Sequence, residues 1–312
     1  MSEDFPVPDT RVLAVASHVV YGYVGNTMAT FVMQSLGCEV AALNTVQFSN
    51  HLGYGQAKGT RATASEISDL YQGLKDSYLD DFNMMLSGYL PGAASVEAVG
   101  TIARDLKLKT TMKPGSFFWV TLSGVKIQDM DTLKLAITTL HEVYKIPHIM
   151  VTSISLPSPG AEPHLSVVGS TMTSTAEPRI FSIKIPAIDC FFSGTGDMFA
   201  ALMLVRFKEA VCNVEGLLEK DAWISDDEVE ATELPLARAT EKVLASMHEV
   251  LGKTKIARDE EIERWKNVVG GRGKDEDSKR EGLVRSKAAE VRLVRNVHFL
   301  KNPVVRFRAE SV

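Results

Sequence analysis

Cysteine is scarce in this sequence, and long apolar runs are missing from it. The 312 residues hold three cysteines, Cys38, Cys190 and Cys212, which are widely spaced and form no CxxC pair. This set suggests neither a disulfide framework nor a zinc knuckle, and it is typical of reduced core residues. No apolar run approaches the roughly 20 residues that cross a bilayer. The start MSEDFPVPDT also lacks the basic and then apolar order of a signal peptide. We therefore expect a soluble protein of the cytoplasm, with the nucleus as the alternative compartment.

An excess of positive charge is also lacking. The net charge is −5, so nothing global favours nucleic acid or an anionic membrane surface as a partner. The final stretch, residues 288–307, is locally basic, but glutamate and aliphatic residues interrupt it. That mixture favours a solvated or docked tail over an arm that binds nucleic acid. The hydrophobic fraction of 45% is enough for a large globular core.

Several common site motifs are absent. The chain contains no Walker A sequence, no GxGxxG fingerprint and no GxSxG elbow, and its seven histidines fall in no metal-ligand spacing. A P-loop, a dinucleotide site, a serine hydrolase and a histidine-based metal centre therefore have no support.

Short apolar runs alternate with helical patterns along the first two thirds of the chain. Strands are predicted at 11–17, 39–48, 83–90, 117–120 and 148–153, and helices at 27–37, 65–75, 93–109 and 129–145. This alternation predicts an α/β fold of three layers, with a mostly parallel central sheet between helices. Two runs without an intervening helix, 165–172 and 179–185, predict an antiparallel pair at the sheet edge.

The rest of the chain is predicted to be helical, and then polar. Long helical patterns cover 197–210 and 234–266, whereas 270–282 is charged and rich in glycine. Such a segment buries too little apolar surface to offset its ordering entropy, which predicts a flexible linker. We expect a flexible N-terminus at 1–10, one domain at 11–266, and a charged linker with a C-terminal tail at 267–312.

The strongest local signal is FFSGTGDMFAALM, residues 191–203. Gly194 and Gly196 let the backbone approach a ligand closely, and the apolar run after them predicts a helix whose first amides point into the loop. Such amides can hold an anion. Asp197, just inside the helix start, could accept a proton from an attacking hydroxyl group. A bare GTGD is equally typical of an ordinary helix start, so this pattern alone leaves both interpretations open.

Several segments, in order, make the pattern specific. They are SHVVYGYVGN at 17–26, LNTVQFSNHLGY at 43–54, SGY at 87–89, VTSISLPSP at 151–159 and FFSGTGD at 191–197. Together they resemble the signature segments of pyridoxal kinases, in the ribokinase-like superfamily. The resemblance covers most of residues 11–255. It implies ATP as the phosphate donor, Mg²⁺ or Zn²⁺ and also K⁺ as cofactors, and a homodimer.

The resemblance also implies roles for individual residues. In the family's pattern the substrate is pyridoxal, pyridoxine or pyridoxamine. Ser17 would bind the pyridine ring, Val24, Phe48 and His51 would line the pocket, and Tyr89 would cover it. Thr152, Ser153 and Thr195 would contact ATP. Gly194, Thr195 and Gly196 would form the anion hole, and Asp197 would be the general base. Each of these residues also has an ordinary structural explanation, as a core, strand-end or loop residue.

The chain departs from the family pattern in two places. Leu52 stands where the family often carries a threonine that contacts the substrate. More seriously, Val120 runs directly into Thr121, so the Asp-Pro-Val-x-Gly-Asp and Asn-x-x-Glu motifs that meet ATP and metal are absent. The missing part resembles a strand–helix–strand unit of roughly 30 residues or more. A mis-spliced or misassembled gene, or an evolved non-catalytic protein, would produce this junction.

The loss has two physical consequences. Removing an inner strand takes main-chain partners from both neighbouring strands, and the γ-phosphate loses its bridging cation. We therefore predict weak or absent activity and reduced stability. The alternatives are a non-catalytic protein that binds a B6 vitamer or a kinase partner, and a kinase of the hydroxymethylpyrimidine type. The substrate segments argue against the latter.

Overall fold

The computed structural model describes residues 5–108, 126–154, 164–269 and 274–312. The chain divides into two compact units. The first comprises Met1–Met112, Ile188–Leu204 and Ser246–Pro303, and the second comprises Lys113–Ala187, Val205–Ala245 and Val304–Val312. Among the described residues, no helix combines the length and apolar character needed to cross a membrane.

The first unit contains a four-stranded sheet in the order β3-β2-β1-β4. Its strands are β1 (Arg11–Tyr21), β2 (Glu39–Asn50), β3 (Gly59–Arg61) and β4 (Met84–Ser87). β2 and β4 flank β1 in parallel, and β3 pairs antiparallel with β2 at the edge. Val12 to Ala16 are all buried, which explains the uninterrupted apolar run, because an inner parallel strand is covered on both faces.

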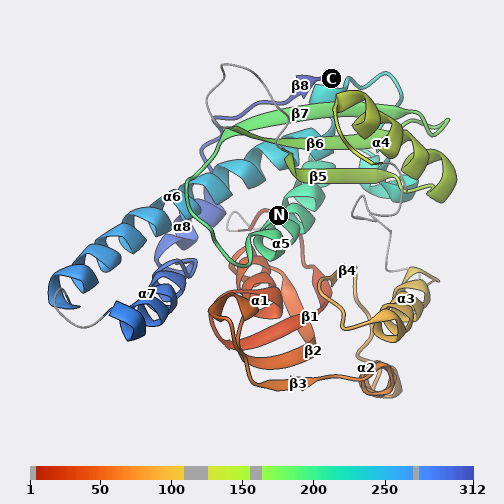
Figure 1. Ribbon diagram of the computed structural model, residues 1–312. Helices are drawn as coiled ribbons and strands as arrows, with labels where there is room; N and C mark the ends of the chain where they lie inside the picture. Colours follow the sequence, from red (N-terminus) through yellow and green to blue (C-terminus); the bar gives the residue numbers. More distant parts are fainter. Residues whose placement is uncertain (1–4, 109–125, 155–163, 270–273) are drawn as a thin grey trace. The chain divides into compact units, whose positions relative to one another are not determined.

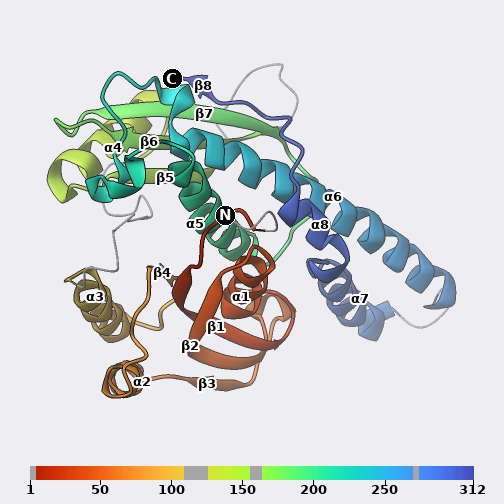
Figure 2. The same ribbon diagram turned by 180° about the vertical axis from the view of Figure 1, so that it is seen from behind.

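Three helices pack with this sheet: α1 (Gly25–Ser35), α2 (Ala64–Asp76) and α3 (Ala93–Leu108). α1 contacts β1 and β2. It ends before Gly37, whose φ of +90° is the left-handed conformation predicted for that glycine. α2 and α3 lie side by side (Figures 1 and 2). They form one core cluster with Leu13 and Val15 of β1.

The second unit contains an antiparallel sheet in the order β5-β6-β7-β8. Its strands are β5 (His148–Ile154), β6 (His164–Met172), β7 (Pro178–Pro186) and β8 (Glu310–Ser311). α4 (Met130–Tyr144) packs against it through Leu133, Ile137 and Leu140. The predicted antiparallel pair is thus confirmed as β6 and β7. The antiparallel part is larger than expected, since β5 pairs antiparallel with β6 and the chain end adds β8.

The remaining helices are α5 (Thr195–Cys212), α6 (Pro235–Val269), α7 (Lys274–Ala288) and α8 (Val297–Lys301). Short 3₁₀ turns occur at Leu52–Tyr54, Leu217–Glu219, Asp221–Trp223, Ala231–Glu233 and Val294–Asn296. The α/β class is confirmed. The strand expected at 117–120 and the junction of Val120 with Thr121 lie outside the described residues.

The predicted linker at 270–282 differs from the structure, because α7 begins at Lys274. Charged residues one turn apart support such a helix, as Arg285 and Glu281 do with a 2.5 Å ion pair. The tail that follows is docked, with Val291, Leu293 and Leu300 buried. Glu290 immediately precedes this buried stretch, so the position of its backbone is fixed by the packing of the residues that follow.

Candidate active site

Asp197 lies in the first turn of α5, and its carboxylate is fixed from another part of the first unit. The backbone N–H of Gly25, at the start of α1, donates to Asp197 Oδ2 over 2.7 Å. Burial raises the pKa of Asp197, and the bond from Gly25 partly offsets that rise. A carboxylate with a raised pKa holds a proton more strongly, which suits a general base.

Gly25 also brings Ser17 to this carboxylate. A Cβ atom on Gly25 would lie 2.3 Å from Ser17 Oγ and 2.1 Å from the Ser17 carbonyl oxygen, and the φ of Gly25 is +53°. Only glycine fits such a contact. The middle of β1, the start of α1 and the start of α5 therefore meet at one point, where Ser17, Gly25 and Asp197 are neighbours.

The two glycines of the predicted anion loop differ in the space around them: Gly194 is crowded, and Gly196 is not. A Cβ atom on Gly194 would lie 2.1 Å from the Tyr23 carbonyl oxygen and 3.2 Å from Val24 Cγ1, so this residue packs against the loop before α1. A Cβ atom on Gly196 would meet nothing within 4 Å. The first-turn amides of α5 lack partners inside the helix. The open side at Gly196 therefore leaves room for an anion at these amides, including that of Thr195.

The SGY segment begins on the last residue of β4 and passes near the other carboxylate oxygen. A Cβ atom on Gly88 would lie 3.7 Å from Asp197 Oδ1, and the next residue, Tyr89, is exposed. The Tyr89 carbonyl oxygen accepts a 2.9 Å bond from Thr45 Oγ1 of β2. Ser17, Asp197 and the backbone of Tyr89 thus gather around Gly25 and Gly88.

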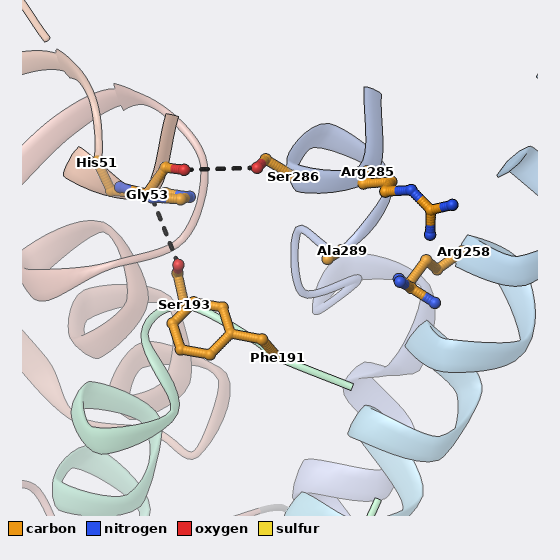
Figure 3. Close-up of a pocket in the computed structure, with 8 residues that line it drawn as sticks. All are labelled: His51, Gly53, Phe191, Ser193, Arg258, Arg285, Ser286 and Ala289. Atoms are coloured by element: carbon orange, nitrogen blue, oxygen red, sulfur yellow. Dashed lines mark hydrogen bonds between the residues drawn. The ribbon is translucent and has the colours of Figure 1, made fainter. Parts of the chain in front are cut away.

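His51 lines a pocket of about 150 Å³ that lies within the first unit (Figure 3). Its walls are His51, Gly53, Phe191, Ser193, Arg258, Arg285, Ser286 and Ala289. Of the residues predicted for the substrate pocket, only His51 is among them. Phe48, on β2, is half-buried under the Arg61 guanidinium group, which lies 5.3 Å from the centre of its ring.

The partner of His51 Nε2 comes from a distant part of the sequence. His51 Nε2 lies 2.9 Å from Glu290 Oε1, and the Tyr54 hydroxyl group donates to the same oxygen over 2.8 Å. Burial and the Glu290 carboxylate raise the pKa of Tyr54 above its usual range. Tyr54 ends the segment LNTVQFSNHLGY, but nothing in the local sequence connects that segment to Glu290, which is 239 residues from His51.

Thr152 and Ser153 belong to the second unit, near the end of β5. The pairing of β5 with β6 shifts between Val151 and Ile154, so these two residues form a bulge. Ser153 has a φ of +59°, which costs a non-glycine residue roughly 1–3 kcal/mol. Bulges and strained residues are common beside functional sites, because both redirect side chains.

The described residues do not fit a protein-held metal ion. Over the ranges that the structure describes, no group of three or more His, Cys, Asp or Glu side chains is placed to hold one.

A half-buried carboxylate beside glycine-rich amides at a helix start, next to an α/β sheet, fits a small-molecule kinase of the ribokinase-like type. Solved structures share the fold. The pyridoxal kinase of Leishmania donovani in complex with ADP and pyridoxine matches with a TM-score of 0.71 and 22% identity, over 98% of this chain and 100% of that one. The pyridoxal kinase of Trypanosoma brucei matches with a TM-score of 0.69 and 22% identity, over 100% of this chain and 99% of that one.

Sequence relatives identify the family. The pyridoxal kinase of Homo sapiens is 31% identical over 68% of this chain and 82% of its own length. A relative from Schizosaccharomyces pombe, whose name also assigns it to the pyridoxal kinases, is 33% identical over 78% of this chain and 85% of its own length. No family model matches the chain. The chain belongs to the pyridoxal kinase family.

The relatives carry residues that this chain lacks. The alignment with the Schizosaccharomyces pombe relative spans 279 positions, whereas 78% of these 312 residues is about 243, so about 36 positions face no residue here. That deficit has the size of the strand–helix–strand unit that the sequence pattern lacks.

Proposed function

We propose that this protein transfers the γ-phosphate of ATP to the 5′-hydroxymethyl group of pyridoxal, and also of pyridoxine and pyridoxamine. The observation that carries the proposal is the carboxylate of Asp197. It is half-buried, the Gly25 N–H holds one of its oxygens at 2.7 Å, and it stands near Ser17 and the Gly194–Gly196 loop.

The chemistry follows from these positions. The hydroxymethyl oxygen attacks the γ-phosphorus, the bond between that phosphorus and the β–γ bridging oxygen breaks, and ADP leaves. Asp197 takes the hydroxyl proton. The amides of Gly194, Thr195 and Gly196 stabilise the charge on the transferred group.

Substrate positioning falls to the other residues of the predicted set. Ser17 binds the pyridine ring, Val24, Phe48 and His51 line the pocket, and Tyr89 covers it. Thr152, Ser153 and Thr195 contact ATP. The bulge at Thr152 and Ser153 supports this assignment, because it turns polar groups out of the ladder of β5.

We further propose that turnover is weak. The chain lacks the Asp-Pro-Val-x-Gly-Asp and Asn-x-x-Glu motifs, so the metal would arrive only as the Mg²⁺ or Zn²⁺ salt of ATP. A site that holds the phosphates without a fixed cation loses much of the charge neutralisation on which phosphoryl transfer depends.

A second candidate is a non-catalytic protein that binds a B6 vitamer. The observation in its favour is the contrast between the substrate side, where Ser17, Gly25 and Asp197 meet, and the nucleotide side, where motifs are missing. A hydroxymethylpyrimidine kinase would share the GTGD segment, but the segments at 17–26 and 43–54 favour pyridoxal.

One experiment separates these functions. The purified chain is given pyridoxal with Mg-ATP or Zn-ATP, with and without K⁺, and pyridoxal phosphate formation is followed while calorimetry measures pyridoxal binding. Slow formation of pyridoxal phosphate supports the kinase, and binding without turnover supports the binder. Absence of both contradicts the proposal.

We also expect a homodimer that acts in the cytoplasm. Light scattering of the purified chain measures its mass in solution, which a homodimer would double relative to the 34.2 kDa of one chain. Microscopy of a tagged chain tests the compartment.

A further inference from the structure

Glu290, far along the chain, reaches the loops around the proposed substrate pocket. Its Oε1 accepts from the Tyr54 hydroxyl group at 2.8 Å and lies 2.9 Å from His51 Nε2, and its Oε2 accepts from the Tyr23 backbone N–H at 3.3 Å. The side chains of His51 and Glu290 are only 11% and 13% exposed. A carboxylate with this many donors is fixed in place.

The segment that carries Glu290 is itself anchored. Val291 and Leu293 are buried. The Arg292 backbone N–H donates to Thr254 Oγ1 at 3.2 Å, and the Arg292 guanidinium group pairs with Glu261 at 2.7 Å. Glu290 is thus held from α6 as well as from its own contacts.

Gly22 shows how closely the carboxylate approaches the loop before α1. A Cβ atom on Gly22 would lie 2.6 Å from Glu290 Oε2 and 2.7 Å from Oε1, and the φ of Gly22 is +101°. This glycine belongs to the SHVVYGYVGN segment, which contributes Ser17 and Val24 to the proposed site.

The contacts of His51 determine which ring nitrogen carries the proton. Nδ1 accepts from the Gly53 backbone N–H at 3.1 Å, so it holds a lone pair, and the proton lies on Nε2, which donates to Glu290. Nδ1 also lies 3.4 Å from Ser193 Oγ, on the pocket wall (Figure 3). Ser193 immediately precedes Gly194 of the anion loop.

We infer that Glu290 is a positioning residue for substrate binding: it holds His51 with the proton on Nε2, so that Nδ1 stays a hydrogen-bond acceptor at the pocket. The inference rests on the proposed function, since it assumes that His51 lines the substrate pocket. It links the C-terminal tail to the pocket through the carboxylate of Glu290, the His51 ring and the Ser193 hydroxyl group.

The test compares Glu290→Leu, Glu290→Gln and the control Glu261→Gln. The control weakens the same anchored segment without touching His51. Each variant is labelled with ¹⁵N-histidine, the His51 signal is assigned by its loss in His51→Gln, and NMR reports which ring nitrogen is protonated. Calorimetry then measures pyridoxal affinity, and thermal melting confirms that each variant folds.

We expect Glu290→Leu to weaken the Nε2–H preference, which the Gly53 N–H alone then supports, and to bind pyridoxal about tenfold more weakly. Glu290→Gln keeps a carbonyl oxygen for Nε2–H, so it restores the preference and most of the affinity, and Glu261→Gln matches the unaltered chain in both. An unchanged His51 tautomer in a folded Glu290→Leu protein overturns the inference. The NMR result needs no ligand, so if the unaltered chain binds no pyridoxal, only the proposed function fails.

Discussion

Glycines determine how closely the parts of this site approach one another. Gly25 and Gly55 both have positive φ angles, +53° and +76°, but only Gly25 is crowded, since a Cβ atom at Gly55 would meet nothing within 4 Å. Substituting each glycine in turn therefore distinguishes the cost of backbone strain, present at both positions, from the cost of steric overlap, present only at Gly25.

We predict that Gly55→Ala lowers the free energy of unfolding by about 1–2 kcal/mol, which is the cost of a left-handed alanine. Gly25→Ala adds a collision with Ser17 and should cost roughly 2–5 kcal/mol in total. It should also weaken pyridoxal binding, because the displaced backbone carries the N–H that holds Asp197. Urea unfolding and calorimetry measure both effects, and equal costs for the two variants would contradict this account of Gly25.

The residues differ in how well the sequence revealed them. Ser17, Gly194 and Asp197 stand in recognisable motifs, and the structure places Ser17 and Asp197 beside Gly25 and Gly194 beside Tyr23. The contact of Glu290 with His51 could not be predicted, because it joins positions 239 residues apart and Glu290 stands in a tail with no motif. Such a contact depends on tertiary packing of buried neighbours, which local patterns do not encode.

At the scale of elements, apolar periodicity predicted most helices and strands well. β1 starts at the predicted residue and runs on to Tyr21, and α1 begins two residues before the predicted helix and ends at Ser35, two residues before the predicted glycine. α7 was missed because its residues are charged rather than amphipathic, so only ion pairs along the helix and the docked tail after it favour helix over linker.

β5 carries a pH-sensitive group in the second unit. His148 is buried, its Nε2–H donates to the Ala222 carbonyl oxygen at 2.6 Å, and its Nδ1 accepts from the Thr171 hydroxyl group at 2.9 Å. Burial lowers the pKa of His148 from 6.5 to about 4. Between these values the unfolded chain binds a proton that the folded chain does not, so stability falls as the pH drops from 6.5 toward 4.

We predict that this group removes about 3 kcal/mol of stability across that pH range. Chemical unfolding at a series of pH values measures the slope. His148→Gln should flatten it, although a smaller slope from His141 should remain, because burial also lowers the pKa of His141. A slope that His148→Gln does not alter would refute the assignment.

At the scale of the whole molecule, the chain keeps the family's substrate segments and lacks a nucleotide segment. The alignment deficit of about 36 positions against the Schizosaccharomyces pombe relative has the size of the missing unit. This loss is visible in the sequence alone, because the two motifs are absent from its residues. Its effect on the sheet could not be derived in the same way, since residues 109–125 lie outside the described ranges.

We predict that restoring this unit restores catalysis. Inserting the corresponding segment of the Homo sapiens relative between Val120 and Thr121 should raise the rate of pyridoxal phosphate formation on the order of 100-fold or more, because the cation at the γ-phosphate regains fixed ligands. A Gly/Ser insert of equal length is the control. If both inserts give the same rate, the missing motifs do not limit turnover. Sequencing the transcript across this junction shows whether the unit is present in the mature message.

The most direct test of the central claim is the rate of pyridoxal phosphate formation by Asp197→Asn relative to the unaltered chain, at saturating Mg-ATP and pyridoxal. Asparagine keeps the shape and can still accept from the Gly25 N–H, but it cannot take the hydroxyl proton. The predicted result is a rate at least about 100-fold lower, with pyridoxal affinity changed by less than about threefold. Equal rates for the two proteins would contradict the role of Asp197 as the general base.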